Sequence, residues 1–199
     1  MTLRRDLELI ADWIRPGSHV LDLGCGDGTL LAHLAETKGT TGYGLEIDPD
    51  NIARCIARGV DVIQTNLDRG LSEFNDNGFD YVLMTQSLQA LHFPDRILEE
   101  MLRIGREAVT SFPNMGHWKC RLQLAFWGHM PFTRALPHRW YDTPNIHLCT
   151  VHDFERLCNE RGYNILERAA VDRQHRETPA TRLVPNLFGE SAVYRFRRA

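Results

Sequence analysis

The chain has 199 residues, of which 43% are hydrophobic, so it can bury one sizeable core and is short for two full domains. Its 26 acidic and 23 basic residues leave a formal net charge of −3, which excludes the strong field of a typical nucleic-acid binder and a polybasic membrane anchor. The five cysteines are widely spaced without a C-x-x-C pair, which favours free thiols in a reducing cytoplasm. We expect a single cytoplasmic domain over residues 1–199, with neither nucleic acid nor a membrane as partner.

Apolar residues at three- and four-residue spacing predict an opening helix that ends at Pro16-Gly17. Short apolar runs then alternate with helical patterns. Strands are predicted over residues 19–23, 42–47, 60–64, 79–84 and 106–112, and helices over residues 28–37, 49–58 and 95–103. This alternation is typical of parallel strands joined by right-handed crossovers, with helices on both faces of an open sheet. Ligand binding is then expected at the carboxyl ends of the strands.

Residues 113–147 lose this alternation and are rich in aromatic side chains and histidines. The aromatic residues in or beside it include Trp118, Phe126, Trp127, Phe132, Trp140 and Tyr141. An insertion of this length and composition is typical of a lid or a partner surface. Thr150 and Asp153 then predict the start of a helix that runs to Arg161. Strands near 163–172 and 190–197 close the chain, separated by a polar run.

Residues 22–28 read Asp-Leu-Gly-Cys-Gly-Asp-Gly and lie between a predicted strand and a predicted helix. Free backbone N–H groups and the helix dipole are expected to face a ligand at such a loop. A dinucleotide fingerprint would need glycine where the chain has Thr29, so NAD is the weaker interpretation. Asp22 would repel a pyrophosphate and suits a ligand with a cationic amine. The alternative is a tight turn without a ligand.

This loop, followed by Gly44-Leu-Glu46-Ile-Asp48, resembles the first two motifs of class I methyltransferases that bind S-adenosylmethionine. The resemblance implies a Rossmann-like α/β fold with a doubly wound, mostly parallel seven-stranded sheet. It also implies that the glycine loop holds the methionine part of S-adenosylmethionine or S-adenosylhomocysteine. Glu46 would then take the ribose hydroxyls, and Ile47 would pack on the adenine. The alternative role for Glu46 is to cap the following helix.

The third motif departs from the family, because Asn66 stands where an aspartate often accepts from the adenine amino group. Its amide oxygen can still accept a hydrogen bond, although a neutral acceptor is weaker than a charged one. The fourth strand ends near Thr85 and Gln86, which by resemblance line the adenosine and transfer region. The expected cofactor-binding residues are therefore Asp22, Gly24, Cys25, Gly26, Gly28, Glu46, Ile47, Asn66, Leu67, Thr85 and Gln86.

A catalytic base is not evident in the sequence. The segment after the fourth strand lacks the N-P-P-Y or D-P-P-Y element that amino-group methylases use. The remaining candidates are His92, His117, His129, His138, His147 and Tyr141, of which none is singled out. His117 and Cys120 stand three apart, but one such pair is a poor zinc signal, and no metal site is expected.

Four segments carry a narrower resemblance, to the methionine-biosynthesis MetW family, over nearly the whole chain. They span residues 15–28, 87–91, 111–118 and 137–147, and the last two are the specific ones. The resemblance implies that the chain acts beside a homoserine O-acyltransferase. The leading hypothesis is an S-adenosylmethionine-binding, activating subunit that contacts the acyltransferase through the aromatic insertion.

Two other functions remain open from the sequence. The chain is alternatively an active small-molecule O- or carboxyl-methyltransferase, in which arginines such as Arg121, Arg134 and Arg139 hold an acidic acceptor. Whether methyl transfer occurs at all is left undecided. A nucleic-acid modifier comes third, because the charge balance opposes it.

Overall fold

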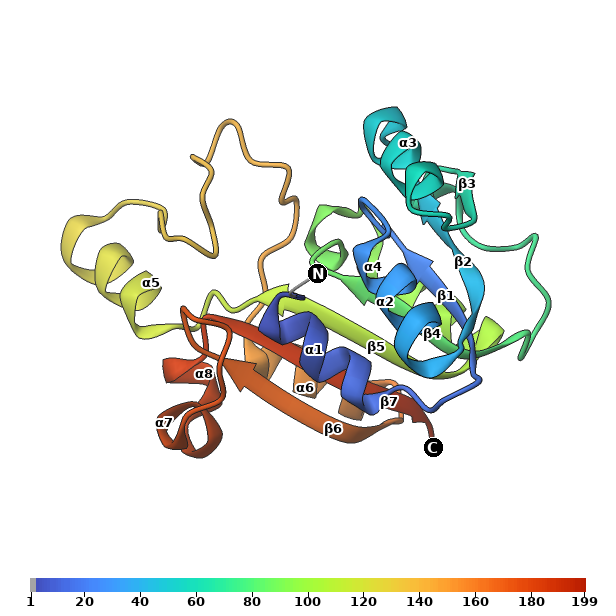
Figure 1. The fold of residues 1–199 in the computed structure, drawn as a ribbon. Coiled ribbons are helices and arrows are strands. Elements are labelled where there is room, and N and C mark those ends of the chain that lie inside the picture. The colour runs from blue at the N-terminus through green and yellow to red at the C-terminus, as the bar shows by residue number, and fades with distance from the viewer. Residues whose placement is uncertain (1–2) are drawn as a thin grey trace.

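The computed structural model describes residues 3–199 and has an α/β architecture (Figure 1). The strands are β1 (His19–Leu23), β2 (Thr41–Glu46), β3 (Val62–Gln64), β4 (Phe79–Thr85), β5 (Gly105–Pro113), β6 (Tyr163–Val171) and β7 (Ser191–Arg198). The α-helices are α1 (Arg5–Trp13), α2 (Thr29–Lys38), α3 (Pro49–Ala57), α4 (Pro94–Ile104), α5 (Trp118–Leu122), α6 (Val151–Glu160), α7 (Pro179–Leu183) and α8 (Pro185–Phe188). Two 3-10 turns, η1 (Leu67–Arg69) and η2 (Leu88–Ala90), and a π-helical segment, η3 (Gln123–Trp127), complete the chain.

The strands form one seven-stranded sheet in the order β3-β2-β1-β4-β5-β7-β6. Within the described chain β7 alone runs opposite to the other six strands, so the predicted mostly parallel sheet is confirmed. The strand order reverses between β1 and β4, because the chain winds outward from β1 to β3 and then returns to the other side of β1. In an open parallel sheet, such a switch point leaves a crevice at the carboxyl ends of the strands.

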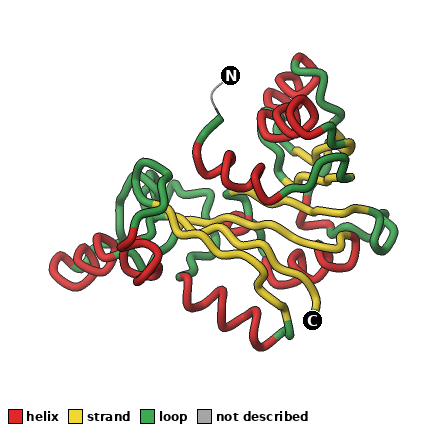
Figure 2. Tube along the Cα trace, turned by 60° about the horizontal axis from the view of Figure 1, so that its bottom comes forward, coloured by secondary structure: helices red, strands yellow, loops and turns green. Residues whose placement is uncertain are grey.

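Helices cover both faces of the sheet, as the alternation predicts. On one face α1 and α2 pack with Val20 and Leu83, and on the other α4 and α6 pack with Leu21 and Met84. Figure 1 shows α1 and α2 in front of the strands and α6 behind them, and Figure 2 shows the same layers from another side. Because side chains alternate along a strand, Asp22 lies on the same face as Val20, toward α1 and α2.

Side-chain caps define the first residues of α3 and α6. Asp48 accepts from the backbone N–H groups of Asp50 at 2.8 Å and Asn51 at 3.4 Å, and Pro49 occupies the first turn of α3. The predicted helix start at Thr150 is confirmed as a reciprocal capping box with Asp153. The Asp48 cap leaves Glu46 free for another role, since a different residue caps α3.

The insertion forms an arm that extends away from the sheet, on the left of Figure 1. It contains α5 and η3 and is otherwise irregular up to the start of α6. The polar run between β6 and β7 contains α7 and α8, two short helices that the sequence did not reveal. Within residues 3–199, no helix combines the length and the apolar character needed to cross a membrane.

Candidate functional site at the switch point

The glycine loop, residues 24–28, joins β1 to α2. Part of it packs against the rest of the protein, and part of it borders open space. Gly24 and Gly26 have φ values of +71° and +57°, in the left-handed region that disfavours side chains. A Cβ on Gly24 would lie 2.6 Å from the Ser87 hydroxyl oxygen, whereas a Cβ on Gly26 would meet nothing within 4 Å. The turn after β4 therefore occupies the space at Gly24, and Gly26 is the glycine that borders an opening.

Most N–H groups of the loop are already used, which corrects the expectation of a free anion cradle. Gly24 and Cys25 both donate to the Leu45 carbonyl, at 2.8 and 3.1 Å. Gly28 donates to the Cys25 carbonyl at 3.1 Å, and Thr29 donates to the Asp27 side chain at 3.1 Å. Since these donors are satisfied and Asp27 adds negative charge, the loop is poorly suited to a phosphate. This geometry weakens the NAD interpretation further.

Glu46 links the end of β2 to the glycine loop. One carboxylate oxygen accepts from Gly26 N–H at 2.8 Å, and the other accepts from Ile47 and Asp48 N–H at 2.8 and 3.0 Å. The residue is only 8% exposed, so these bonds hold the carboxylate in one orientation. A carboxylate has about four lone-pair sites, and three are engaged here. Glu46 is thus placed to accept one further hydroxyl from the crevice.

Asp22 is a buried carboxylate without a compensating partner. It is 1% exposed, and its Oδ1 atom has no hydrogen-bond partner within the described chain. Burial, together with the nearby charge of Glu46, raises the pKa of Asp22 to about 7. A buried ionised group is costly unless it is paired, so this site favours a cation or a hydrogen-bond donor against Asp22.

The other predicted cofactor residues follow the carboxyl ends of β2 and β3 or lie in the glycine loop, and they differ in exposure and in their contacts. Ile47 is 57% exposed at the end of β2. Asn66 caps η1 by accepting from Asp68 N–H at 3.0 Å, and Leu67 packs partly against the core. The Cys25 sulfur lies 3.8 Å from the Cys55 sulfur, and burial raises the pKa of both thiols. The side chain of Cys25 therefore supports the loop from the protein side.

The turn after β4 carries Gln86 in a left-handed conformation, with φ +59°. Its N–H donates to the Ser111 carbonyl at 3.0 Å, and its own carbonyl accepts from the Gln89 side chain at 2.7 Å. A non-glycine residue held in this conformation is a strained feature that often lies at a functional site. Ser87, which was not among the predicted site residues, packs against Gly24 and so places this turn next to the glycine loop.

The histidines that the sequence offers as candidate catalytic bases do not group together beside this turn. His92 pairs with Asp68 at 2.8 Å, and the ring of His147 lies 3.2 Å from the His92 carbonyl. His117 is buried at the start of α5, and burial lowers its pKa. His129 and His138 line a groove of about 710 Å³ in the insertion, together with Trp140 and Tyr141. No group of three or more potential metal ligands occurs in residues 3–199.

The sequence reading missed His175, which lines a cavity together with Gln86. Its Nδ1 atom is buried and lies 3.6 Å from the carboxylate of Asp6, which is itself fully buried. His175 sits in the polar run between β6 and β7, more than half the chain away from β1. No local pattern in the sequence connects it with the glycine loop.

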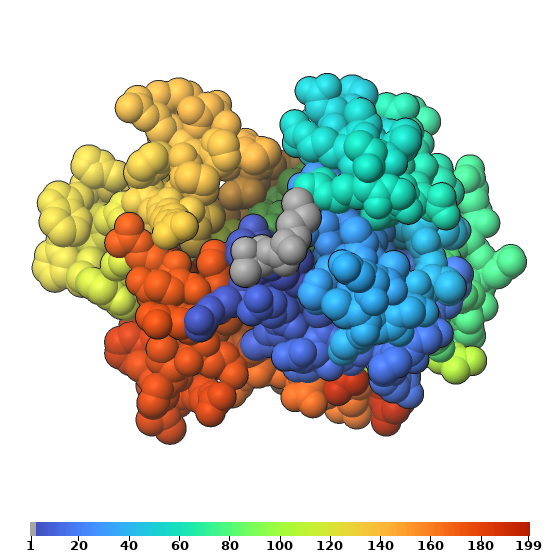
Figure 3. All heavy atoms as spheres, in the orientation of Figure 1, coloured from blue at the N-terminus to red at the C-terminus, as the bar shows by residue number. Residues whose placement is uncertain are grey.

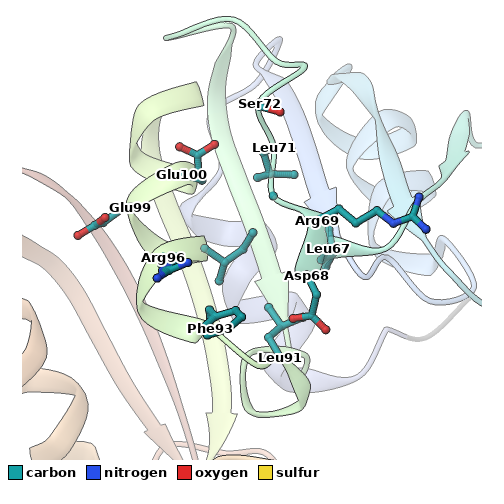
Figure 4. A pocket seen from close by; sticks show the side chains of 12 residues that line it. Leu67, Asp68, Arg69, Leu71, Ser72, Leu91, Phe93, Arg96, Glu99 and Glu100 are labelled. Atoms are coloured by element: carbon teal, nitrogen blue, oxygen red, sulfur yellow. The ribbon is translucent and has the colours of Figure 1, made fainter.

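A separate cavity of about 440 Å³ lies beside Leu67, between η1 and α4 (Figure 4). Its acidic residues Glu99 and Glu100 are paired with Arg161 and Arg103. Arg69 points away from the other side chains in this view. The residues that line it do not include the glycine loop or Glu46, so it is not the crevice at the switch point.

Solved structures with the same fold define the class of this protein. A methyltransferase from Archaeoglobus fulgidus, described as dependent on S-adenosylmethionine, superposes with a TM-score of 0.70 at 15% identity, covering 98% of this chain and 92% of that one. A methyltransferase from Mesorhizobium loti, described in the same way, gives 0.69 at 19% identity and covers 96% of each chain. The fold is therefore that of the class I methyltransferases.

Sequence comparison identifies the family. The family model described as methionine biosynthesis protein MetW matches residues 4–196, so the chain belongs to the MetW family. The chain is also 36% identical over 209 residues to the bifunctional methionine biosynthesis protein MetXA/MetW of Rhodopirellula baltica. That alignment covers 100% of this chain but 33% of its relative, so the chain spans about a third of the length of that protein.

The raised pKa of Asp22 predicts a specific dependence of stability on pH. Because the folded-state pKa of about 7 exceeds the ordinary value of 3.8, this group stabilises the fold most at low pH. That contribution is lost as the pH rises through 7, and it amounts to at most about 4 kcal/mol. Asp22→Asn stays neutral, so its free energy of unfolding should fall less than that of the wild type between about pH 5 and pH 8.

Urea unfolding at several pH values measures this difference, and Asp12→Asn, at an exposed position on α1, is the matched control. If the free energy of unfolding depends equally on pH in the wild type and in Asp22→Asn, ionisation of Asp22 does not destabilise the folded protein and the prediction is wrong.

Proposed function

We propose that the chain binds S-adenosylmethionine, or S-adenosylhomocysteine, at the switch point and serves as an activating subunit of a homoserine O-acyltransferase. The observation that carries the ligand assignment is the buried Asp22 carboxylate, whose Oδ1 atom has no partner in residues 3–199 and which lies near Glu46. Membership of the MetW family and the methyltransferase fold support the same assignment.

The charges of the crevice match the two ends of an adenosyl amino acid. Asp22 would face the ammonium group of the methionine part, and this contact would remove the cost of its buried charge. Glu46 would accept from a ribose hydroxyl with its remaining lone pair, while its bond to Gly26 holds the loop in place. Ile47 offers an exposed apolar side chain to the adenine, next to Asn66 and Leu67.

The ligand proposal predicts a different effect for each carboxylate. Glu46→Gln should weaken S-adenosylmethionine and 5′-methylthioadenosine alike, by about tenfold or more, because both ligands carry the ribose. Asp22→Asn should weaken only S-adenosylmethionine, because 5′-methylthioadenosine has no amino-acid part. Calorimetric titration of both ligands measures these affinities.

Glu36→Gln, at an exposed position on α2, is the control and should bind like the wild type. Undiminished affinity in Glu46→Gln, or no binding of S-adenosylmethionine to the folded wild type, would overturn the ligand assignment.

The insertion supports the proposed partnership, because its aromatic side chains are exposed. Phe126, Trp127, Phe132, Trp140 and Tyr141, which we call the partner surface, are between 58% and 76% exposed. Aromatic residues are enriched at protein interfaces, and contiguous exposed apolar patches mark interaction sites. In the Rhodopirellula baltica relative, whose name joins MetXA and MetW, the matched part is covalently linked to a further segment twice as long.

The partnership predicts loss of complex formation when the partner surface is truncated. The Phe126→Ala, Trp140→Ala double variant should bind the homoserine O-acyltransferase of the same organism at least tenfold more weakly, because buried aromatic anchors dominate interface energies. The acyltransferase should also lose its activation by this chain. Biosensor binding and an acyl-transfer assay with and without the chain measure both effects.

Leu183→Ala is the control, since Leu183 is an 83% exposed apolar residue on α7, outside the partner surface. The partnership is wrong if the acyltransferase has the same activity with and without the wild-type chain and no complex forms.

A second candidate function, methyl transfer to a small molecule, is favoured by one observation. His175 lines the same cavity as Gln86 and has the Asp6 carboxylate 3.6 Å from its Nδ1 atom. An aspartate behind an imidazole can orient it as a general base for an oxygen nucleophile. The chain is also 33% identical over 131 residues to a nocamycin O-methyltransferase of Saccharothrix syringae, covering 58% of this chain and 45% of that enzyme.

Methyl transfer predicts a labelled product when the chain is incubated with methyl-labelled S-adenosylmethionine and a metabolite extract. His175→Ala should lower the yield by about a hundredfold, because removing a general base has an effect of this size. His152→Ala, at an exposed position on α6, is the control. Absence of any labelled product with the wild type counts against this second function.

A further inference from the structure

A further cavity, of about 400 Å³, is lined by Gln86, the residue before the Ser87 that packs against the glycine loop. Its walls come from Arg4, Gln86, residues in 134–137 of the insertion, residues in 172–175 after β6, and residues 190–191 at the start of β7. Figure 3 shows the insertion, in yellow, against the orange-red segment that follows β6. We call this space the arginine cavity. Its volume is in the range of sites for small molecules.

The charged groups of the arginine cavity are unequally paired. Arg4 is neutralised by the buried Asp6, through contacts of 2.6 and 2.9 Å. Asp172 accepts from the N–H groups of residues 174 and 176 in its own turn, both within 2.9 Å. Arg134 and Arg173 have no carboxylate within 4.0 Å among the residues that the structure describes. Two guanidinium groups are therefore available to an anion from solvent.

The same cavity contains Glu190, whose carboxylate is paired with a cation through one oxygen only. Glu190 is 8% exposed, and its Oε1 atom lies 3.3 Å from the Lys119 ammonium group. Its second oxygen makes no hydrogen bond within residues 3–199. Besides the paired Arg4 and Asp172 and the ring of His175, a ligand in this cavity thus meets Arg134, Arg173 and Glu190, with the short apolar side chains of Ala135 and Pro137 beside them.

We propose that the arginine cavity binds a small α-amino acid. Its carboxylate would lie between Arg134 and Arg173, because guanidinium groups match the geometry of a carboxylate. Its ammonium group would face the free oxygen of Glu190, and its side chain would lie toward Ala135 and Gln86. This inference goes beyond the adenosyl site, since none of the residues that recognise the amino acid belongs to the glycine loop or to β2.

Gln86 places the amino acid next to the adenosyl site. Gln86 lines the arginine cavity, while its neighbour Ser87 contacts the glycine loop at Gly24. One turn of the chain, residues 86–87, therefore contacts both the arginine cavity and the glycine loop. The chemistry of the second ligand agrees with the membership of the chain in a methionine-biosynthesis family.

The test compares ligands that differ by one group. L-homoserine and L-methionine carry both charges, 4-hydroxybutanoate lacks the amine of homoserine, and inorganic phosphate is an anion without a carboxylate. Calorimetry on the full chain, in the absence of S-adenosylmethionine, should show that both amino acids bind more tightly than 4-hydroxybutanoate and phosphate. The Arg134→Ala, Arg173→Ala double variant should bind the amino acids at least tenfold more weakly.

Glu190→Gln separates recognition of the amine from recognition of the anion. It should reduce the affinity for L-homoserine to that for 4-hydroxybutanoate, and leave the affinity for 4-hydroxybutanoate unchanged. Arg106→Ala is the matched control, because Arg106 is 68% exposed at the start of β5 and lies outside the arginine cavity. Circular dichroism verifies that each variant is folded.

The proposal is overturned if neither amino acid binds at ~10 mM, a concentration that detects millimolar affinity. It is also overturned if phosphate or 4-hydroxybutanoate binds as tightly as L-homoserine, or if the double arginine variant binds like the wild type. A separate titration with S-adenosylmethionine distinguishes the two proposals, because the adenosyl site can fail or succeed without the arginine cavity.

Discussion

The bond between the Glu46 carboxylate and Gly26 N–H is the interaction on which the crevice depends. It ties the carboxyl end of β2 to the loop that follows β1, so that two neighbouring strands present their ends in one fixed arrangement. The remaining bonds of Glu46 go to the two residues that follow it. The carboxylate is therefore oriented before any ligand arrives, and little conformational entropy is lost when a ligand binds.

This arrangement lowers the stability of the fold, because it places the Glu46 carboxylate near the buried Asp22. Two carboxylates near each other in a buried region repel, and the raised pKa of Asp22 reflects both burial and this repulsion. A core selected for stability alone would place a neutral residue at position 22. Retaining an aspartate there is understandable if the group has a task with a positively charged partner, because function often requires a locally unfavourable arrangement.

Much of the fold could be predicted from the sequence because its signals are local. The helix start at Thr150 and Asp153 is a pattern within four residues, and the β1–loop–α2 unit is marked by glycines at alternate positions 24, 26 and 28. The proximity of Asp22 and Glu46 could also be predicted, because neighbouring parallel strands have their carboxyl ends at the same edge of the sheet. The sequence did not predict that the loop N–H groups are already hydrogen-bonded, because their acceptors, the Leu45 carbonyl and the Glu46 carboxylate, belong to another strand. The arginine cavity escaped prediction for the same reason, as Arg134, Arg173 and Glu190 meet only through the sheet order.

The turn at Gln86 and Ser87 has a consequence for how two ligands would influence each other. Held by Ser111 and Gln89 in a strained conformation, it lines the arginine cavity at Gln86 and packs against the glycine loop at Ser87. A displacement of this turn by a ligand on one side would therefore alter the site on the other. Thermodynamic reciprocity then requires that the factor by which an adenosyl compound alters the amino-acid affinity equals the factor in the opposite direction. Each of the two proposed ligands would thereby change the concentration at which the other is bound.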